Sequence, residues 1–406
     1  MRPLNDKDIV DAYHYMLGRW LVLRQETLDF NEKFAWNEIV HRQPGGVAWA
    51  NPNLDVAYSE AWIYVDESSC TIIELPAIKR RYYTVQVMNG WAEVIININE
   101  RNFPEHPFGR FAFCLRGAHP DLPPGTQRID VPGKKLRVLM RIELGANPAE
   151  ALALQKQVTM RATGSPEPEG VAAAFSFPND KLPGADAFAE TEAILGSDAD
   201  INIGMEEPQR KAREVARAVA DPAARAHIDD VIRKQAIPAF YAYQKQFGTV
   251  KDGWIHPRPA GNYGSDFLMR GFTNFVGIWA NNAHEVTYYG APSFDGSKTY
   301  VQTFPKSALP ESKARYFWSV IVVDSERFQV IPNPLKRYVL NQQSGLEFNR
   351  DGSLTLGFAP TQPDRVPKTN WLPTPEGKKY SLTYRFYGPT EDVVTGKYFP
   401  PPMLQR

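Results

Sequence analysis

The strongest constraint on the fold is the placement of short β-forming segments, which gather near both ends of the chain. They are rich in β-branched and aromatic residues and are separated by turns such as Asn89-Gly90 and Asp351-Gly352. The N-terminal set is 57–65, 71–75, 82–88, 93–98, 111–115 and 136–144. The C-terminal set is 286–289, 300–304, 316–323, 354–358 and 380–387. Short strands at this spacing predict sandwiches or barrels.

The segment between these two sets has a different pattern. Residues 148–161 and 206–248 are predicted to be helical, and Pro222 and Pro238 interrupt the second stretch. Residues 164–184 contain four prolines and are predicted to form a loop. The chain therefore reads as β, then helical, then β.

A helix is also predicted over residues 6–29, with Asp6 as its N-cap, and a short apolar one over 263–280. We expect four parts. They are an N-terminal helix with its lead-in (1–45), a β-domain (46–146), a helical middle region (147–262) and a second β-domain (263–406).

The charge balance and the lengths of the apolar runs disfavour nucleic acid and membranes as partners. Lys and Arg together number 46, as do Asp and Glu, so the formal net charge is zero. The basic footprint of a nucleic-acid-binding protein is absent. No apolar run approaches the ~18 residues of a spanning helix, so no membrane partner is predicted. The first residues lack the apolar core of a signal peptide. We expect a soluble protein, cytoplasmic as given, or periplasmic or secreted if a leader has been removed.

Cys70 and Cys114 are the two cysteines of the chain. Two cysteines make neither a disulfide framework nor a CxxC metal-binding motif. A single bridge is open to them, but we expect two buried thiols, because free cysteine is among the most buried residue types.

Several motifs in a fixed order point to a family. Near the N-terminus they are residues 51–62 (NPNLDVAYSEAW), Glu74-Leu75-Pro76 and Arg81-Tyr82-Tyr83. The C-terminal motifs are denser, and comprise residues 317–320 (FWSV), 333–338 (NPLKRY), 351–354 (DGSL), 370–373 (NWLP) and 385–389 (RFYGP), with Arg270, Asn281, Tyr288 and Asp324. In this order they resemble a bacterial family that pairs domain of unknown function 1254 with domain of unknown function 1214. The resemblance implies a mainly β fold: an N-terminal β-sandwich, a helical region and a C-terminal jelly-roll-like β-domain. It implies no agreed activity.

The chain also departs from the family pattern at three places. Asn89 stands where the family usually has Asp, and residues 97–108 replace a Gly-rich stretch. His284-Glu285 stands where the family tends to have Glu-Asp. If these positions form a site, the chemistry of this protein differs from that of its relatives.

Several enzyme signatures are missing from the sequence. There is no GxSxG, SxxK or HExxH motif, and no GxGxxG follows a predicted strand. Serine hydrolases, zincins, P-loop enzymes and Rossmann dehydrogenases are therefore disfavoured. The seven histidines lack metal-ligand spacing. We predict no cofactor, although a divalent metal site assembled in three dimensions from His and carboxylates stays open.

Asp55 is the best candidate acid, because it lies in a Pro- and Asn-rich loop directly before a strand. The alternative is an Asx-turn that only shapes the loop. Tyr58 and Trp62 share one face of the following strand and are candidates to line a pocket, or else to form core. Arg81 is a candidate anion ligand or an ion-pair partner. Trp91, after the Asn89-Gly90 turn, is a candidate stacking platform or a cover for the sandwich.

Asn281, His284 and Arg337 are the C-terminal candidates. His284 adjoins Glu285 at a helix-to-strand corner, so the two are a feasible acid–base pair. The alternative is a surface histidine without function. Asn281 is a candidate substrate ligand. Arg337 is a candidate carboxylate clamp, or a side chain that ties a loop to backbone carbonyls.

We expect a small-molecule site in the cleft between the two β-domains, with Asp55 and His284 catalytic and Tyr58, Trp62, Arg81, Trp91, Asn281 and Arg337 binding the substrate. Any activity would be cofactor-independent acid–base chemistry, hydrolase- or lyase-like. One alternative is a non-catalytic binding module for a carbohydrate or another small ligand. The other is a structural or assembly protein, a homo-oligomer whose residues 398–402 (YFPPP) would wrap a neighbouring subunit.

Overall fold

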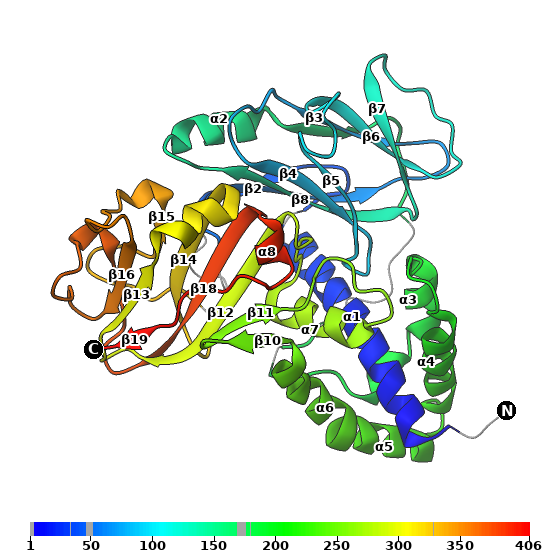
Figure 1. Ribbon diagram of the computed structural model, residues 1–406. Coiled ribbons are helices and arrows are strands. Elements are labelled where there is room, and N and C mark those ends of the chain that lie inside the picture. Colours follow the sequence, from blue (N-terminus) through cyan, green and yellow to red (C-terminus); the bar gives the residue numbers. More distant parts are fainter. Residues whose placement is uncertain (1–3, 33, 46–51, 169–175, 179, 328) are drawn as a thin grey trace.

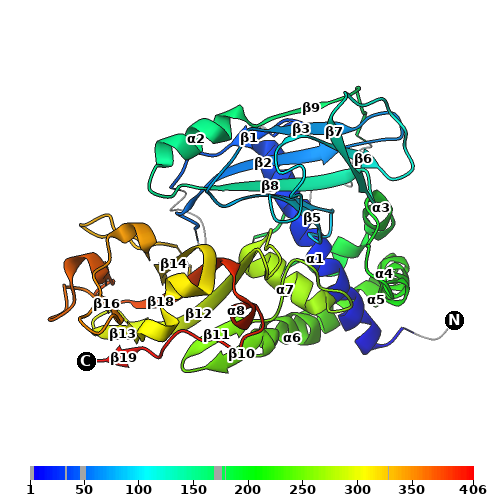
Figure 2. The ribbon, with the colours of Figure 1, turned by 45° about the horizontal axis from the view of Figure 1, so that its top comes forward.

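The computed structural model describes residues 4–32, 34–45, 52–168, 176–178, 180–327 and 329–406. Two β-regions lie next to each other, and most helices gather beside them (Figures 1 and 2). The described strands form four sheets, and no sheet closes into a barrel. The fold is therefore mainly β, with the helical group between the two β-regions in the sequence.

The N-terminal β-region is a sandwich. Sheet A has the order β1-β2-β8-β4-β5 and sheet B the order β7-β6-β3-β9. The strands are β1 (Val40–His41), β2 (Val56–Tyr64), β3 (Thr71–Leu75), β4 (Tyr83–Met88), β5 (Val94–Ile98), β6 (Gly109–Leu115), β7 (Thr126–Val131), β8 (Lys135–Glu143) and β9 (Thr159–Ala162). A core that includes Ile73, Val85, Phe111 and Val138 fills the space between the sheets. The other face of sheet A is rich in charged and aromatic side chains.

The C-terminal β-region also packs two sheets. Sheet C has the order β10-β11-β12-β18-β14-β15 and sheet D the order β17-β16-β13-β19. The strands are β10 (Gly248–Lys251), β11 (Trp254–Pro257), β12 (Val286–Asp295), β13 (Tyr300–Phe304), β14 (Ala314–Asp324), β15 (Val339–Asn341), β16 (Leu354–Ala359), β17 (Trp371–Pro373), β18 (Lys379–Pro389) and β19 (Leu404–Gln405). Trp318, Tyr384 and Phe386 belong to the core between them. Sheet B takes β9, and sheet C takes β10 and β11, from outside the β-domain limits predicted at residues 146 and 263.

Several helices pack around α1 (Asp6–Asn31), which Figure 1 shows in dark blue running from the helical group towards the sandwich. The others are α2 (Pro148–Gln157), α3 (Thr191–Ser197), α4 (Glu206–Ala218), α5 (Pro222–Val231), α6 (Ile237–Ala242), α7 (Phe267–Gly277) and α8 (Glu391–Val394). The short helices are η1 (Ala185–Phe188), η2 (Ile232–Ala236), η3 (Tyr243–Gln246), η4 (Lys306–Ala308), η5 (Pro310–Lys313), η6 (Gln342–Ser344) and η7 (Lys368–Asn370). No described helix combines the length and the hydropathy needed to cross a membrane.

One local detail differs from the sequence prediction, and a second concerns the segment 398–402. The N-cap of α1 is Asn5 instead of Asp6, because the Asn5 side chain accepts a hydrogen bond from the Asp8 backbone N–H. The proline-rich C-terminal segment folds onto its own domain: the Pro401 carbonyl accepts hydrogen bonds from Trp254 and Gln302, and β19 pairs with β13.

Cys70 and Cys114 form a disulfide, which corrects the expectation of two thiols. The reason is the register of β3 and β6. These strands are antiparallel with Thr71 opposite Phe113, so the two cysteines lie opposite each other with their Cα atoms 4.5 Å apart. The bond joins two neighbouring strands of sheet B, and it closes a loop that contains β4 and β5 of sheet A.

Replacing both cysteines by alanine should lower the free energy of unfolding by about 2–4 kcal/mol, because the crosslink no longer restricts the unfolded chain. Urea unfolding under non-reducing conditions measures this. The wild type with added reductant is the matched control and should lose a similar amount. Equal stability of the oxidised wild type and the double variant would contradict a disulfide at this place.

Candidate functional site

The two β-regions meet where the outer face of sheet A contacts sheet C, a contact we call the junction. Its central interaction is the ion pair of Arg101, which follows β5, with Glu285, which precedes β12. The Arg101 Nη2 lies 2.6 and 2.5 Å from the two Glu285 carboxylate oxygens. Glu285 also accepts hydrogen bonds from the Tyr82 hydroxyl at 3.1 Å and the Asn99 amide at 3.0 Å. The buried carboxylate is thus satisfied entirely by donors from the sandwich.

Amide side chains extend the junction. Asn97 and Asn281 exchange two hydrogen bonds of 3.0 and 2.9 Å. Gln86 on β4 donates to the Ala280 carbonyl at 2.9 Å. The rings of Tyr82 and Tyr387 pack edge to face beside these bonds. Because the bonds are directional and buried, they fix the orientation of the two β-regions.

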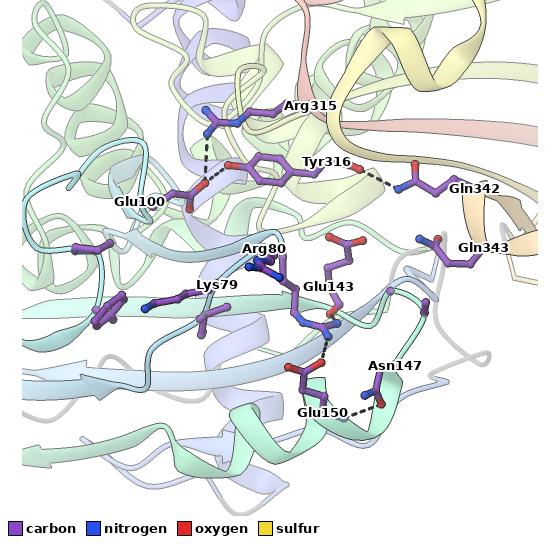
Figure 3. A pocket seen from close by; sticks show the side chains of 16 residues that line it. Lys79, Arg80, Glu100, Glu143, Asn147, Glu150, Arg315, Tyr316, Gln342 and Gln343 are labelled. Carbon is purple, nitrogen blue, oxygen red and sulfur yellow. Dashed lines mark hydrogen bonds and ion pairs between the residues drawn. The ribbon is translucent and has the colours of Figure 1, made fainter.

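A cleft of about 840 Å³ opens at the edge of the junction. The sandwich supplies Ile78, Lys79, Arg80, Arg81, Glu100, Pro107, Phe108, Glu143, Gly145, Ala146, Asn147 and Glu150, and the C-terminal region supplies Arg315, Tyr316, Gln342 and Gln343. Figure 3 shows Arg315, Tyr316 and the two glutamines on the side opposite Lys79, Arg80 and Glu150. The walls are mostly charged or polar, so the cleft suits a polar molecule of small size.

The positively charged side chains that line the cleft differ in how many partners they have. Arg81 donates to the carbonyls of Glu143 and Leu144 at 2.6 and 2.8 Å and pairs with Glu150 at 2.9 Å. Lys79 and Arg80 form no ion pair with any carboxylate in the described part of the chain. Arg80 has a backbone φ of 58°, a left-handed conformation that costs a non-glycine residue energy and gathers at functional sites. Lys79 and Arg80 are therefore available to an anion.

Glu143, at the end of β8, is the buried carboxyl of the cleft. Its Oε2 accepts a hydrogen bond from the Tyr82 backbone N–H at 3.0 Å. Burial raises the pKa of Glu143, Asp55 raises it further, and the Tyr82 N–H and Arg81 lower it. A carboxyl with a raised pKa inside a cleft is suited to proton transfer.

Tyr316 lies on the facing wall. Its hydroxyl donates to Glu100 and accepts from Arg101 Nη1 at 2.7 Å. Burial, followed by the hydrogen bond to Glu100, raises the pKa of Tyr316 to about 12, so the phenol stays protonated. Arg101 thus contacts both Glu285 in the junction and Tyr316 in the cleft.

Asp55, Tyr58 and Arg81 lie in or near the cleft and junction. Arg81 lines the cleft, as described above. Asp55 is buried at the start of β2, where its Oδ1 accepts a hydrogen bond of 2.7 Å from Asn341. Burial raises the pKa of Asp55, while Ser319, Asn341 and Arg385 favour its charged form. Tyr58 packs against Arg141 in the junction. The Asx-turn is formed by Asn53, whose side chain accepts from the Asp55 N–H.

The two predicted tryptophans lie in cores, fully buried. The Trp62 indole donates to Asp29 of α1 at 2.9 Å, and the Trp91 indole donates to the Asp198 carbonyl at 3.0 Å. Both are out of reach of the cleft. Trp91 covers the helical core and stacks with Arg270, whose Cζ is 4.6 Å from its ring.

The three C-terminal candidates are separated. Asn281 is buried in the amide pair of the junction. His284 is exposed at the helix-to-strand corner and does not line the cleft. Arg337 donates to the backbone carbonyls of Lys368 and Trp371, which is the loop-tying alternative considered from the sequence.

Sequence reasoning missed Lys79, Arg80, Glu143 and Tyr316. Lys79 and Arg80 could have been found, because the run Lys79-Arg80-Arg81 lies directly before a predicted strand. Tyr316 has no local signal, because it reaches the cleft only through domain packing. The described residues contain no group of three or more His, Cys, Asp or Glu side chains placed to hold a metal ion.

Comparison with known proteins agrees with the fold. The family model described as protein of unknown function DUF1254 matches residues 36–162, and the one described as protein of unknown function DUF1214 matches residues 289–391. No curated protein matches the chain. The crystal structure of the VPA0106 protein from Vibrio parahaemolyticus is 18% identical, with a TM-score of 0.65, and the match covers 99% of this chain and 100% of that one. A putative uncharacterized protein from Burkholderia cenocepacia is 12% identical with a TM-score of 0.47, covering 99% and 94%.

Replacing Arg101 by methionine should lower the free energy of unfolding by about 3–5 kcal/mol, because buried Glu285 loses its cation. Urea denaturation followed by tryptophan fluorescence measures the change. Arg210→Met is the matched control: Arg210 pairs with Glu207 and Glu214 on an exposed helix face, and its loss should cost at most about 1 kcal/mol. Equal losses in the two variants would show that the junction does not depend on this pair.

Proposed function

Because the chain belongs to the family that pairs a DUF1254 domain with a DUF1214 domain, and neither description names an activity, we propose its function from the geometry: the cleft binds a small polar molecule that carries an anionic group. The observation that carries this proposal is the pair Lys79 and Arg80, two cations in the cleft that have no carboxylate partner among the described residues. An anion there gains charge-assisted hydrogen bonds that the protein itself does not supply.

We further propose that the bound molecule undergoes acid–base chemistry of a hydrolase- or lyase-like kind. Glu143 and Tyr316 differ strongly in acidity, and such a pair suits one proton acceptor and one proton donor. We assign to Glu143 the catalytic role predicted for Asp55 and His284, since neither of those side chains lines the cleft. Gln342 and Gln343 offer neutral hydrogen bonds that would orient the ligand.

A carbohydrate-binding module is the weaker alternative. Such a module stacks sugar rings on solvent-facing aromatic side chains. The tryptophans in the described ranges are all buried or half-buried, so they offer no such platform. The Cys70–Cys114 disulfide supports a periplasmic or secreted location, because disulfides persist in oxidising compartments.

Arg80→Ala should weaken binding of inorganic sulfate, used as a divalent anion probe, by about tenfold or more, since a lost charge-assisted hydrogen bond is worth about 1.5–3 kcal/mol. Isothermal titration calorimetry on the full chain measures the affinity. The control is Arg350→Ala, which removes an exposed positive charge outside the cleft and should leave the affinity unchanged. If both variants bind sulfate like the wild type, the cleft is not the anion site.

Sulfate affinity should rise as the pH falls through the raised pKa of Glu143. Below that pKa the carboxyl is neutral and no longer repels the anion, whereas sulfate keeps its charge. Glu143→Gln should bind sulfate more tightly at pH 7.5 and lose this part of the pH dependence. Calorimetric titrations of both proteins between pH 4.5 and 8 test this. An identical pH profile in the variant would remove Glu143 from the site.

A further inference from the structure

Arg141 is a buried cation that has no counter-ion in the described part of the chain. It lies on β8, is 4% exposed, and faces sheet C across the junction. Its Nη1 donates to the Gln86 side-chain oxygen at 2.6 Å, and its Nη2 donates to the Trp279 carbonyl at 3.3 Å. Its Nε has no acceptor. Both partners are neutral, and no described carboxylate lies within ion-pair distance.

Arg137, on the same strand and the same face, is the internal comparison. It is also fully buried, and its guanidinium contacts two carboxylates, Glu60 and Asp29, the latter at 3.2 Å. Burial of a charge is costly unless an opposite charge compensates it. The chain therefore compensates one buried arginine of β8 completely and leaves the other with neutral acceptors.

Tyrosine side chains surround Arg141. Four tyrosines interact with it electrostatically, namely Tyr58, Tyr82, Tyr288 and Tyr387. The Tyr58 ring centroid lies 5.6 Å from Cζ of Arg141. Tyr58 and Tyr288 are half-buried, whereas Tyr82 and Tyr387 are fully buried. Solvent thus reaches part of Tyr58 and Tyr288.

A second buried arginine lies across the junction. Arg385 on β18 pairs in register with Tyr288 on β12, and its Cζ lies 6.0 Å from the Tyr288 ring centroid. Arg385 stabilises the charged form of Asp55. The nearby Asp55 carboxylate therefore interacts with Arg385, and Arg141 is the cation that keeps only neutral acceptors.

We propose that Arg141 is the anchor of a second binding site, for a carboxylate-bearing small molecule. The Nε–H and an Nη2–H of a guanidinium point in parallel and bind a carboxylate side-on. In Arg141 this side-on edge comprises Nε, which has no acceptor, and Nη2, whose hydrogen bond to the Trp279 carbonyl is long at 3.3 Å. The phenols of Tyr58 and Tyr288 add hydrogen-bond donors beside it. This site is distinct from the cleft, since none of its side chains lines the cleft.

Acetate is the probe for this site, at pH 7.5 and at an ionic strength held constant with sodium chloride. Saturation-transfer NMR of the acetate methyl group detects binding to the full-length wild type without any substitution. We expect transfer in the wild type and in Arg80→Ala, and its loss in the double variant Arg80→Ala/Arg141→Met, in which a cleft cation is removed as well. Arg80→Ala removes a cation of the cleft and leaves Arg141 in place. The experiment can therefore contradict one of the two proposals without contradicting the other.

Absence of transfer in the wild type, or transfer that persists in Arg80→Ala/Arg141→Met at the level of Arg80→Ala, would overturn the proposal. Loss of transfer in Arg80→Ala alone would assign the acetate to the cleft and would also overturn it. If Arg141→Met does not fold, Arg141→Lys serves instead. Lysine keeps the charge but lacks the side-on edge, so acetate affinity should fall about tenfold, and unchanged affinity would refute the role of Arg141.

Discussion

The contact between Arg101 and Glu285 is the interaction on which the arrangement of the two β-regions depends. Glu285 is almost fully buried, and the three side chains that donate the four hydrogen bonds described for its carboxylate all come from the sandwich. A buried carboxylate without these donors would cost several kcal/mol, so the two β-regions are held in one orientation. The same arginine also holds Tyr316, so the junction and the cleft share one structural element.

The junction is polar for a physical reason. Sheet A already buries one apolar face against sheet B, and its other face carries charged residues at alternate positions of β8. Such a face is stable only when other elements compensate each charge. Helix α1 does so for Lys135 through Glu26 and for Arg137 through Asp29. Arg141 lies beyond the reach of this compensation, which is why we place a ligand there.

Much of the fold could be predicted from the sequence because it depends on local patterns. The helix expected at 6–29 is Asp6–Asn31, and the one expected at 263–280 is Phe267–Gly277. The site depends on partners far apart in the chain. Arg81 was found because a motif marked it, whereas Trp62 and Trp91 face cores that no single strand reveals. Glu143 and Tyr316 line one cleft only after the two β-regions pack, so neither could be identified locally.

The central claim is that the boundary between the two β-regions binds a small anion. The most direct measurement is a crystal structure of the full chain grown with sulfate. We expect sulfate density in the cleft within hydrogen-bond distance of Arg80 or Lys79, with the Arg101–Glu285 pair intact beside it. An empty cleft together with ordered sulfate only at exposed surfaces elsewhere would contradict it.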